Sequence, residues 1–184
     1  MPLAFYQSNR HESLAQACQK IGAKESALVS AEQVHADRIA FVTAKHLGQR
    51  IPGVDALITN EKNVPLVIRT ADCAPVLIHD SKTGILALVH AGRKGTELAI
   101  TAKTIARIDA DPKNLVIKIG PCIGKCCYPM DIRAENLKQL ARVGVLSENI
   151  EVAPDCTCCN NDTYFSYRGD GPATGRMFLV ASLL

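Results

Sequence analysis

The chain contains 184 residues, of which 47% are hydrophobic and 4% aromatic, and its formal net charge is +3. This length and apolar content predict one globular domain over residues 1–184. The basic residues are scattered and tryptophan is absent, which argues against a nucleic-acid partner and against a membrane belt. No apolar window approaches the roughly 20 residues of a membrane span and no signal peptide is recognisable, so we expect a cytoplasmic protein.

The elements predicted in the first ninety residues are one helix and a series of strands. Leu14, Ala17, Cys18 and Ile21 recur at helical spacing, which predicts a helix over residues 12–21 that ends at Gly22. Runs rich in valine and isoleucine predict strands over residues 27–30, 39–43, 55–59, 64–70, 75–79 and 85–90.

The second half of the chain alternates helices with strands. A glycine-containing turn after His90 leads into a predicted helix over residues 96–108, and Asp111-Pro112 is a turn signal before a predicted strand over residues 115–119. We expect a further helix over residues 134–143 and a buried strand over residues 177–184. Helices inserted among strands in one domain predict the α+β class.

Three residues beside the predicted strands carry donors suited to a metal ion. His35 lies near a strand start, His90 ends a strand, and Cys73 interrupts two apolar runs together with Asp72. Two imidazoles and one thiolate suit zinc, and three protein ligands leave a fourth position for water or substrate. The spacing forms no short zinc motif. Structural roles for the histidines and a core role for Cys73 are the alternatives.

Six short motifs are spread over nearly the whole chain. They are Gln-Val-His at 33–35, Gly-Val-Asp-Ala-Leu-Ile-Thr at 53–59, Thr-Ala-Asp-Cys-Ala-Pro-Val-Leu at 70–77, Val-His-Ala-Gly at 89–92, Ile-Gly-Pro-Cys-Ile-Gly at 119–124 and Phe-Ser-Tyr-Arg at 165–168. In content and order they resemble the motif series of the multicopper polyphenol oxidase-like, or laccase-domain, family. The resemblance implies mixed β-sheets in layers flanked by helices, an architecture similar to that of toxin deamidases with a Cys-His pair. It also implies that His35, Cys73 and His90 bind one zinc ion.

The resemblance implies several activities. Members of the family are described as oxidising polyphenols with copper, as cleaving purine nucleosides by phosphorolysis, as deaminating adenosine, or as editing peptidoglycan precursors. Zinc has no redox chemistry but lowers the pKa of a bound water molecule. We therefore expect a zinc-dependent rather than copper-dependent enzyme whose small-molecule partners are a purine nucleoside and phosphate, acting by phosphorolysis, by adenosine deamination or by both.

Further candidate site residues flank this group. Arg93 and Lys94, before the predicted helix, are candidate ligands for a substrate anion, or else solvated surface charges. Asp72 is a candidate catalytic residue beside Cys73 and His90, either orienting a histidine or transferring a proton. A turn alone would also explain an aspartate there.

The sequence departs from the family pattern at several positions. Arg93-Lys94 replaces a common Trp-Arg, Gly169 replaces a usual arginine, and the stretch before Glu12 replaces a further segment. These departures favour a divergent binding protein without activity as a second hypothesis. A polyphenol oxidase is a third, for which the sequence lacks His-x-His arrays. A fourth is a metal-free hydrolase with Cys73 as nucleophile and His90 as base.

Six of the eight cysteines form two clusters, Cys122/Cys126/Cys127 and Cys156/Cys158/Cys159. Without a secretory signal, reduced thiols are expected. The clusters together could form a second, structural zinc site, a disulfide, or a set of ordinary thiols. The three histidines outside the motifs, at positions 11, 46 and 79, are expected to be surface or structural residues.

Overall fold

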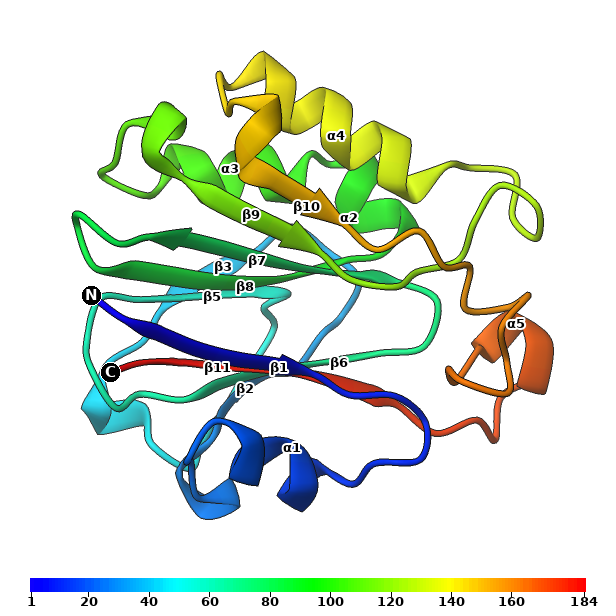
Figure 1. The fold of residues 1–184 in the computed structure, drawn as a ribbon, viewed down its shortest axis with the longest axis horizontal. Coiled ribbons are helices and arrows are strands. Elements are labelled where there is room, and N and C mark those ends of the chain that lie inside the picture. The colour runs from blue at the N-terminus through cyan, green and yellow to red at the C-terminus, as the bar shows by residue number, and fades with distance from the viewer.

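The computed structural model describes residues 1–184 and contains two β-sheets that pack face to face. Both parallel and antiparallel strand pairs occur in each sheet. In Figure 1, helices α2, α3 and α4 cover the outer face of the six-stranded sheet, and α1 covers the outer face of the five-stranded sheet. The expected α+β fold, with mixed sheets in layers flanked by helices, is therefore confirmed.

The strands fall into two sets. The six-stranded sheet has the order β10 (Ile150–Val152), β9 (Val116–Ile119), β7 (Ala74–Asp80), β8 (Ile85–Ala91), β5 (Ala56–Thr59) and β3 (Ile39–Phe41). The five-stranded sheet has the order β1 (Leu3–Gln7), β11 (Met177–Leu183), β6 (Leu66–Thr70), β2 (Val29–Ala31) and β4 (Arg50–Ile51).

The helices are short. They are α1 (Leu14–Lys20), α2 (Arg93–Glu97), α3 (Ile100–Ala106), α4 (Ile132–Arg142) and α5 (Tyr167–Asp170), with 3-10 helices at Glu25–Ala27, Ala44–His46, Pro112–Asn114 and Ser147–Asn149. None of them combines the length and the apolar character that crossing a membrane requires.

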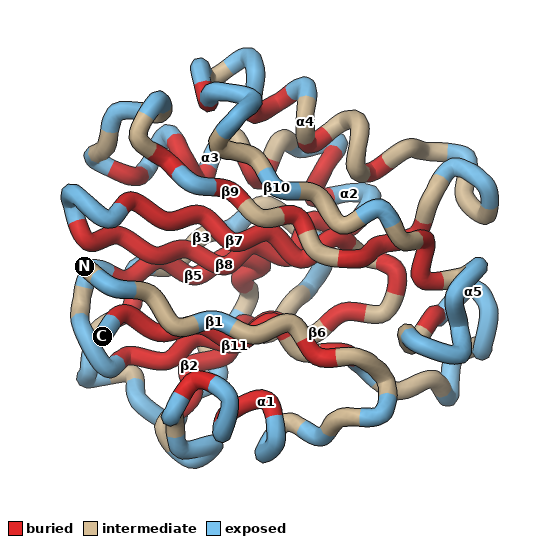
Figure 2. Tube along the Cα trace, viewed as in Figure 1, coloured by how far each residue is buried: buried red, intermediate tan, exposed pale blue.

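The two central strands, β7 and β8, are buried along their whole length (Figure 2). Successive side chains of a strand point to opposite faces of the sheet, so each strand contributes to two cores. Val76 and Ile78 pack into the core beneath the helices, whereas Leu77 packs into the core between the sheets. This double burial explains why these strands are continuous apolar runs instead of alternating patterns.

Most of the predicted elements are present within one or two residues of their expected bounds. The predicted helix at 12–21 is α1, the one at 134–143 is α4, and the predicted terminal strand is β11. Four strands or α-helices, β1, β4, β10 and α5, were not predicted. Three of these are strands or helices of two to four residues, too short for a periodic pattern, and β1 has intermediate burial along most of its length.

The single helix predicted over residues 96–108 is wrong, because the segment forms α2 and α3 with a break between them. Ala99 adopts the left-handed conformation, with φ of 59°. A continuous helix would need the carbonyl of Thr96 for the amide of Ile100. That carbonyl instead accepts hydrogen bonds from the Ala99 amide at 3.0 Å and from Gln139 Nε2 of α4 at 2.7 Å. The contact with α4 thus replaces one helical hydrogen bond.

Candidate functional site

Three side chains singled out from the sequence meet beside the ends of interior strands of the two sheets. His35 lies in the loop after β2, Cys73 lies between β6 and β7, and His90 is the penultimate residue of β8. Their donor atoms all lie within 4.8 Å of one another. The His35 and His90 rings are edge to face, with centroids 4.8 Å apart. Antiparallel pairing of β7 with β8 sets His90 opposite Pro75, two residues after Cys73, and this register brings thiol and imidazole together.

Asp55 positions both histidines. Its fully buried carboxylate accepts hydrogen bonds from the backbone amides of Val34, His35 and Ala36 at 3.1, 2.9 and 2.9 Å. Its Oδ1 also accepts a hydrogen bond from His90 Nδ1 at 2.8 Å. Because Nδ1 of His90 donates to this carboxylate, Nε2 is the nitrogen left to accept a proton or bind a metal.

Backbone geometry around the group is unusual in two places. The loop that carries His35 has positive φ angles at Gln33, 62°, and at His35 itself, 59°, and the Asp55 carboxylate caps this loop. Gly92 lies against the group, since a Cβ atom there would be 2.9 Å from Cys73 Sγ and 3.2 Å from His35 Cδ2. Only glycine leaves room for both side chains at this point.

The electrostatics favour an ionised thiol beside a charged imidazole. Burial alone would raise the pKa of Cys73, but hydrogen bonds from His35 and His90 lower that pKa to about 6. Burial alone would lower the pKa of His90, but hydrogen bonds with Asp55 and Cys73 raise that pKa to about 9. Burial likewise acts to raise the pKa of Asp55, and the hydrogen bonds from His90 and the loop amides keep it below the usual value. The thiol is therefore available as a thiolate near neutral pH.

Asp72 lies next to Cys73 but points toward the C-terminal loops. Its Oδ1 accepts a hydrogen bond from Thr157 Oγ1 at 2.7 Å, and its Oδ2 accepts one from the Arg168 amide at 2.7 Å. Its backbone carbonyl accepts a further hydrogen bond from the Ile123 amide at 2.8 Å. The contact with a histidine that the sequence suggested for Asp72 is made by Asp55. Asp55 belongs to the Gly-Val-Asp-Ala motif, so the signal was present, but its role depends on the pairing of β5 with β8.

The three donor residues form one wall of a pocket of about 900 Å³. Polar and charged residues dominate the rest of the lining, and three arginines are among them. Arg69 makes no hydrogen bond or ion pair through its guanidinium, and both burial and the neighbouring charge of Arg50 lower its pKa. The full lining is Ser30, Ala31, Glu32, Gln33, His35, Arg50, Arg69, Ala71, Cys73, His90, Tyr167 and Arg176. Arg93 and Lys94 are exposed and lie outside this lining.

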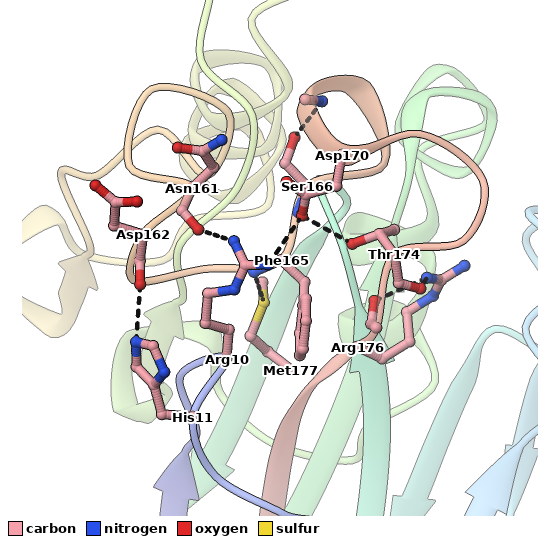
Figure 3. A network of polar contacts seen from close by, with 12 residues as sticks. Arg10, His11, Asn161, Asp162, Phe165, Ser166, Asp170, Thr174, Arg176 and Met177 are labelled. Carbon is pink, nitrogen blue, oxygen red and sulfur yellow. Dashed lines mark hydrogen bonds and ion pairs between the residues drawn. The ribbon is translucent and has the colours of Figure 1, made fainter.

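The segment that supplies Tyr167 and Arg176 is fixed by the N-terminal stretch (Figure 3). Arg10 donates a hydrogen bond to the carbonyl of Asn161, forms an ion pair with Asp170 at 3.6 Å and stacks over the Phe165 ring at 4.8 Å. His11 Nε2 is 2.8 Å from the carbonyl oxygen of Asp162. The stretch before α1 therefore helps to hold one wall of the pocket, a contact that no sequence pattern predicted.

Comparison with known proteins identifies the family. A family model described as multi-copper polyphenol oxidoreductase laccase matches residues 7–131 and 128–184. The purine nucleoside phosphorylase YlmD of Geobacillus stearothermophilus is 31% identical over 190 residues, which cover 81% of this chain and 69% of the relative. A purine nucleoside phosphorylase of Streptomyces coelicolor is 32% identical over 190 residues, covering 88% and 77%.

Solved structures of similar proteins have the same fold. The crystal structure of YlmD from Geobacillus stearothermophilus aligns with a TM-score of 0.87 at 28% identity, covering 92% of this chain and 78% of that one. The crystal structure of the hypothetical protein YfiH of Bacillus licheniformis aligns with a TM-score of 0.86 at 28% identity, covering 91% and 78%. The chain belongs to the multi-copper polyphenol oxidoreductase laccase family, which includes proteins named purine nucleoside phosphorylases.

Proposed function

We propose that this protein is a zinc-dependent purine nucleoside enzyme that cleaves the bond between purine and ribose with phosphate. The observation that carries the proposal is the pocket itself, which is lined both by the group His35, Cys73 and His90 and by three arginines. The names of the relatives agree with this choice of substrate.

The donor set fits zinc. Two imidazole nitrogens and one thiolate sulfur within 4.8 Å of one another match the ligand types of a catalytic zinc site with an open position. Bound there, zinc would supply a Lewis acid or an activated water molecule. The protein's part is to keep Cys73 ionised and to hold His90 in the tautomer that leaves Nε2 free, a task of the Asp55 carboxylate.

The arginines fit an anionic co-substrate. Arg69 forms no ion pair, and it lines the same cavity as Arg50, which is 3.8 Å from Glu32. A phosphate group would relieve the repulsion between these two charges through bidentate hydrogen bonds. Phosphorolysis then depends on holding the phosphate near the ribose and on stabilising the leaving purine. We assign phosphate binding to these arginines, and an anion-binding role for Arg93 and Lys94 stays a separate prediction.

The pocket also offers a surface for the purine. Tyr167 lines the pocket and 54% of its surface is exposed. An exposed aromatic ring at a pocket mouth can stack on a flat heterocycle. The cavity volume of about 900 Å³ lies within the range of small-molecule sites and accommodates a nucleoside together with phosphate.

The test is a direct assay of the metal-replete protein. Adenosine or inosine is incubated with and without phosphate, and free base, ribose 1-phosphate and ammonia are separated and quantified. Release of base that requires phosphate supports phosphorolysis, and release of ammonia from adenosine identifies deamination at the same centre. If folded protein with one zinc in this group releases no base in the presence of phosphate, the proposed phosphorolysis is wrong.

The pairing of an ionised Cys73 with a charged His90 favours a second candidate, a cysteine hydrolase without metal. In that enzyme Cys73 Sγ would attack the carbonyl carbon of an amide or ester, and His90 would protonate the leaving group as the bond to it breaks. Water would then hydrolyse the resulting thioester and release Cys73. Trapping Cys73 with iodoacetamide distinguishes the two functions. Zinc protects the thiol if it is a metal ligand, whereas a free nucleophile reacts at the same rate with and without zinc.

A further inference from the structure

Four thiols meet in a second group, away from the pocket. Cys126 and Cys127 lie in the loop between β9 and α4, and Cys156 and Cys159 lie in the loop after β10. Their sulfur atoms all lie within 4.8 Å of one another. Two of the separations are 3.3 Å, between Cys126 and Cys159, and 3.4 Å, between Cys127 and Cys159. None of the four lines the pocket.

The spacing of the sulfur atoms matches a tetrahedral metal site. Zinc–sulfur bonds of about 2.3 Å place neighbouring sulfur atoms of a tetrahedron about 3.8 Å apart. Two of the observed separations lie about 0.4 to 0.5 Å below this value, and all of them are shorter than 4.8 Å, so the four sulfur atoms are close enough to surround one ion. Cys156 and Cys159 have the Cys-x-x-Cys spacing that is common in structural zinc sites.

The backbone around the thiols is shaped for a close approach of the two loops. The Gly124 amide donates a hydrogen bond to Cys156 Sγ at 3.2 Å. A Cβ atom at Gly124 would be 3.2 Å from Cys126 Sγ and 3.3 Å from Cys156 Cβ. Glycine therefore allows the loops to approach, and its amide supports negative charge on the sulfur.

Several thiols at one place cannot all ionise without a cation. A divalent ion at the centre would remove this limit, because thiolates are stabilised by direct coordination. Four thiolates exclude magnesium and calcium, which prefer oxygen donors, and favour zinc.

We propose that Cys126, Cys127, Cys156 and Cys159 bind one structural zinc ion, separate from the group formed by His35, Cys73 and His90. Four protein ligands close the coordination sphere, so this ion has no open position for a substrate. Its role is to join the two loops.

The joined loops hold the backbone next to the candidate active site. Thr157, between two of the proposed ligands, donates its hydroxyl to Asp72, and the Ile123 amide of the other loop donates to the carbonyl of the same residue. The backbones of Cys122 and Cys156 also pair as an isolated parallel β-bridge between the loops, with both thiols free. Asp72 immediately precedes Cys73 and has a positive φ of 87°. The structural zinc would therefore fix the position of Cys73 through Asp72.

The decisive experiment counts the metal ions bound after two of the three proposed ligands of the His35, Cys73 and His90 group have been removed. The double variant His35→Ala, Cys73→Ser is purified and its zinc content is measured by elemental analysis, with folding checked by circular dichroism. We expect one zinc per chain. Adding Cys126→Ser and Cys159→Ser should remove it, whereas adding Cys158→Ser, in the same loop but outside the group, should leave it. A folded double variant without zinc, or zinc that survives the Cys126→Ser and Cys159→Ser changes, would overturn the proposal.

A second measurement uses the unaltered chain, in case the serine variants do not fold. Cobalt replaces zinc, and the near-ultraviolet sulfur-to-metal absorption reports the number of thiolate ligands. Absorption of a four-thiolate tetrahedral site in addition to a one-thiolate site supports the proposal. Absorption from a one-thiolate site alone refutes the proposal. A protein mass that is lower by two hydrogen atoms, which shows a disulfide among these cysteines, refutes it as well. Because neither measurement depends on nucleoside turnover, failure of the proposed function would leave this result unaffected.

Discussion

The buried carboxylate of Asp55 lies 2.8 Å from His90 Nδ1 and also accepts the amides of the loop that carries His35. One side chain thus orients two of the three proposed ligands, although they come from segments more than fifty residues apart in the sequence. Substitution of this carboxylate should therefore affect metal binding without removing a proposed ligand.

Asp55→Asn should weaken zinc binding at the His35, Cys73 and His90 group by about 10- to 100-fold, the usual effect of losing a carboxylate that supports a ligand histidine. The amide cannot accept all the hydrogen bonds that the carboxylate accepts. Competition with a chelator measures the affinity. Asp37→Asn is the matched control, because Asp37 lies on the surface with Lys103 as its partner, and it should leave the affinity unchanged.

Gly92→Ala should abolish metal binding at the same group without unfolding the protein. The new Cβ would be 2.9 Å from Cys73 Sγ, so the thiol must move away from the two histidines. Elemental analysis and a thermal melt provide the comparison. Gly169→Ala serves as control, since its nearest neighbour would be at an ordinary 3.4 Å. Full zinc occupancy in Gly92→Ala would show that the ligands do not lie where we place them.

Arg69→Ala should raise the KM for phosphate by about 10- to 100-fold, equivalent to the roughly 1.5–3 kcal/mol of a hydrogen bond to a charged group. Lys94→Ala should have little effect, because Lys94 is exposed outside the pocket. Initial rates at varied phosphate concentration decide the matter. A larger increase in this KM for Lys94→Ala than for Arg69→Ala would instead place the anion site at the start of α2.

Thr157→Val should lower the free energy of unfolding by about 1–3 kcal/mol, because the buried Asp72–Thr157 hydrogen bond has a charged acceptor. Thr157→Ser keeps the hydroxyl and should recover most of the loss. Urea unfolding of the three proteins at matched zinc concentration gives the values. Equal destabilisation by valine and serine would contradict this assignment, because serine keeps the hydroxyl that donates to Asp72.

Ala99→Gly should increase stability by about 1 kcal/mol, since Ala99 has a φ of 59° that costs a residue with a Cβ about that much. Ala102→Gly, inside α3, should instead decrease stability by about 1 kcal/mol. The two glycine variants therefore have opposite signs, and thermal unfolding distinguishes them.

The break at Ala99 also shows where sequence patterns fall short. The apolar periodicity after His90 is helical on both sides of the break, and only the hydrogen bond from Gln139, forty-three residues from Thr96, interrupts the helix. The long buried strands were predictable because β7 and β8 are apolar on both faces. The convergence of His35, Cys73 and His90 was expected from the motifs, whereas the part played by Asp55 required the pairing of β5 with β8.

The pocket arginines were not predictable for a related reason. Arg50 and Arg69 lie on β4 and β6, with β2 between them. Neither strand contributes a recognisable motif at the arginine itself. An anion site was predicted beside Val-His-Ala-Gly because a local pattern exists there, whereas distant cations meet around one cavity only through the order of the strands.

The order of strands in the five-stranded sheet constrains synthesis of the chain. β1 pairs only with β11, and β11 separates it from β6. As the polypeptide leaves the ribosome, the first strand has no partner until the last one emerges, and β6 presents an open edge during that interval. Chaperones that cover such edges should therefore bind nascent forms of this protein. Their release should coincide with insertion of residues 177–183 between β1 and β6.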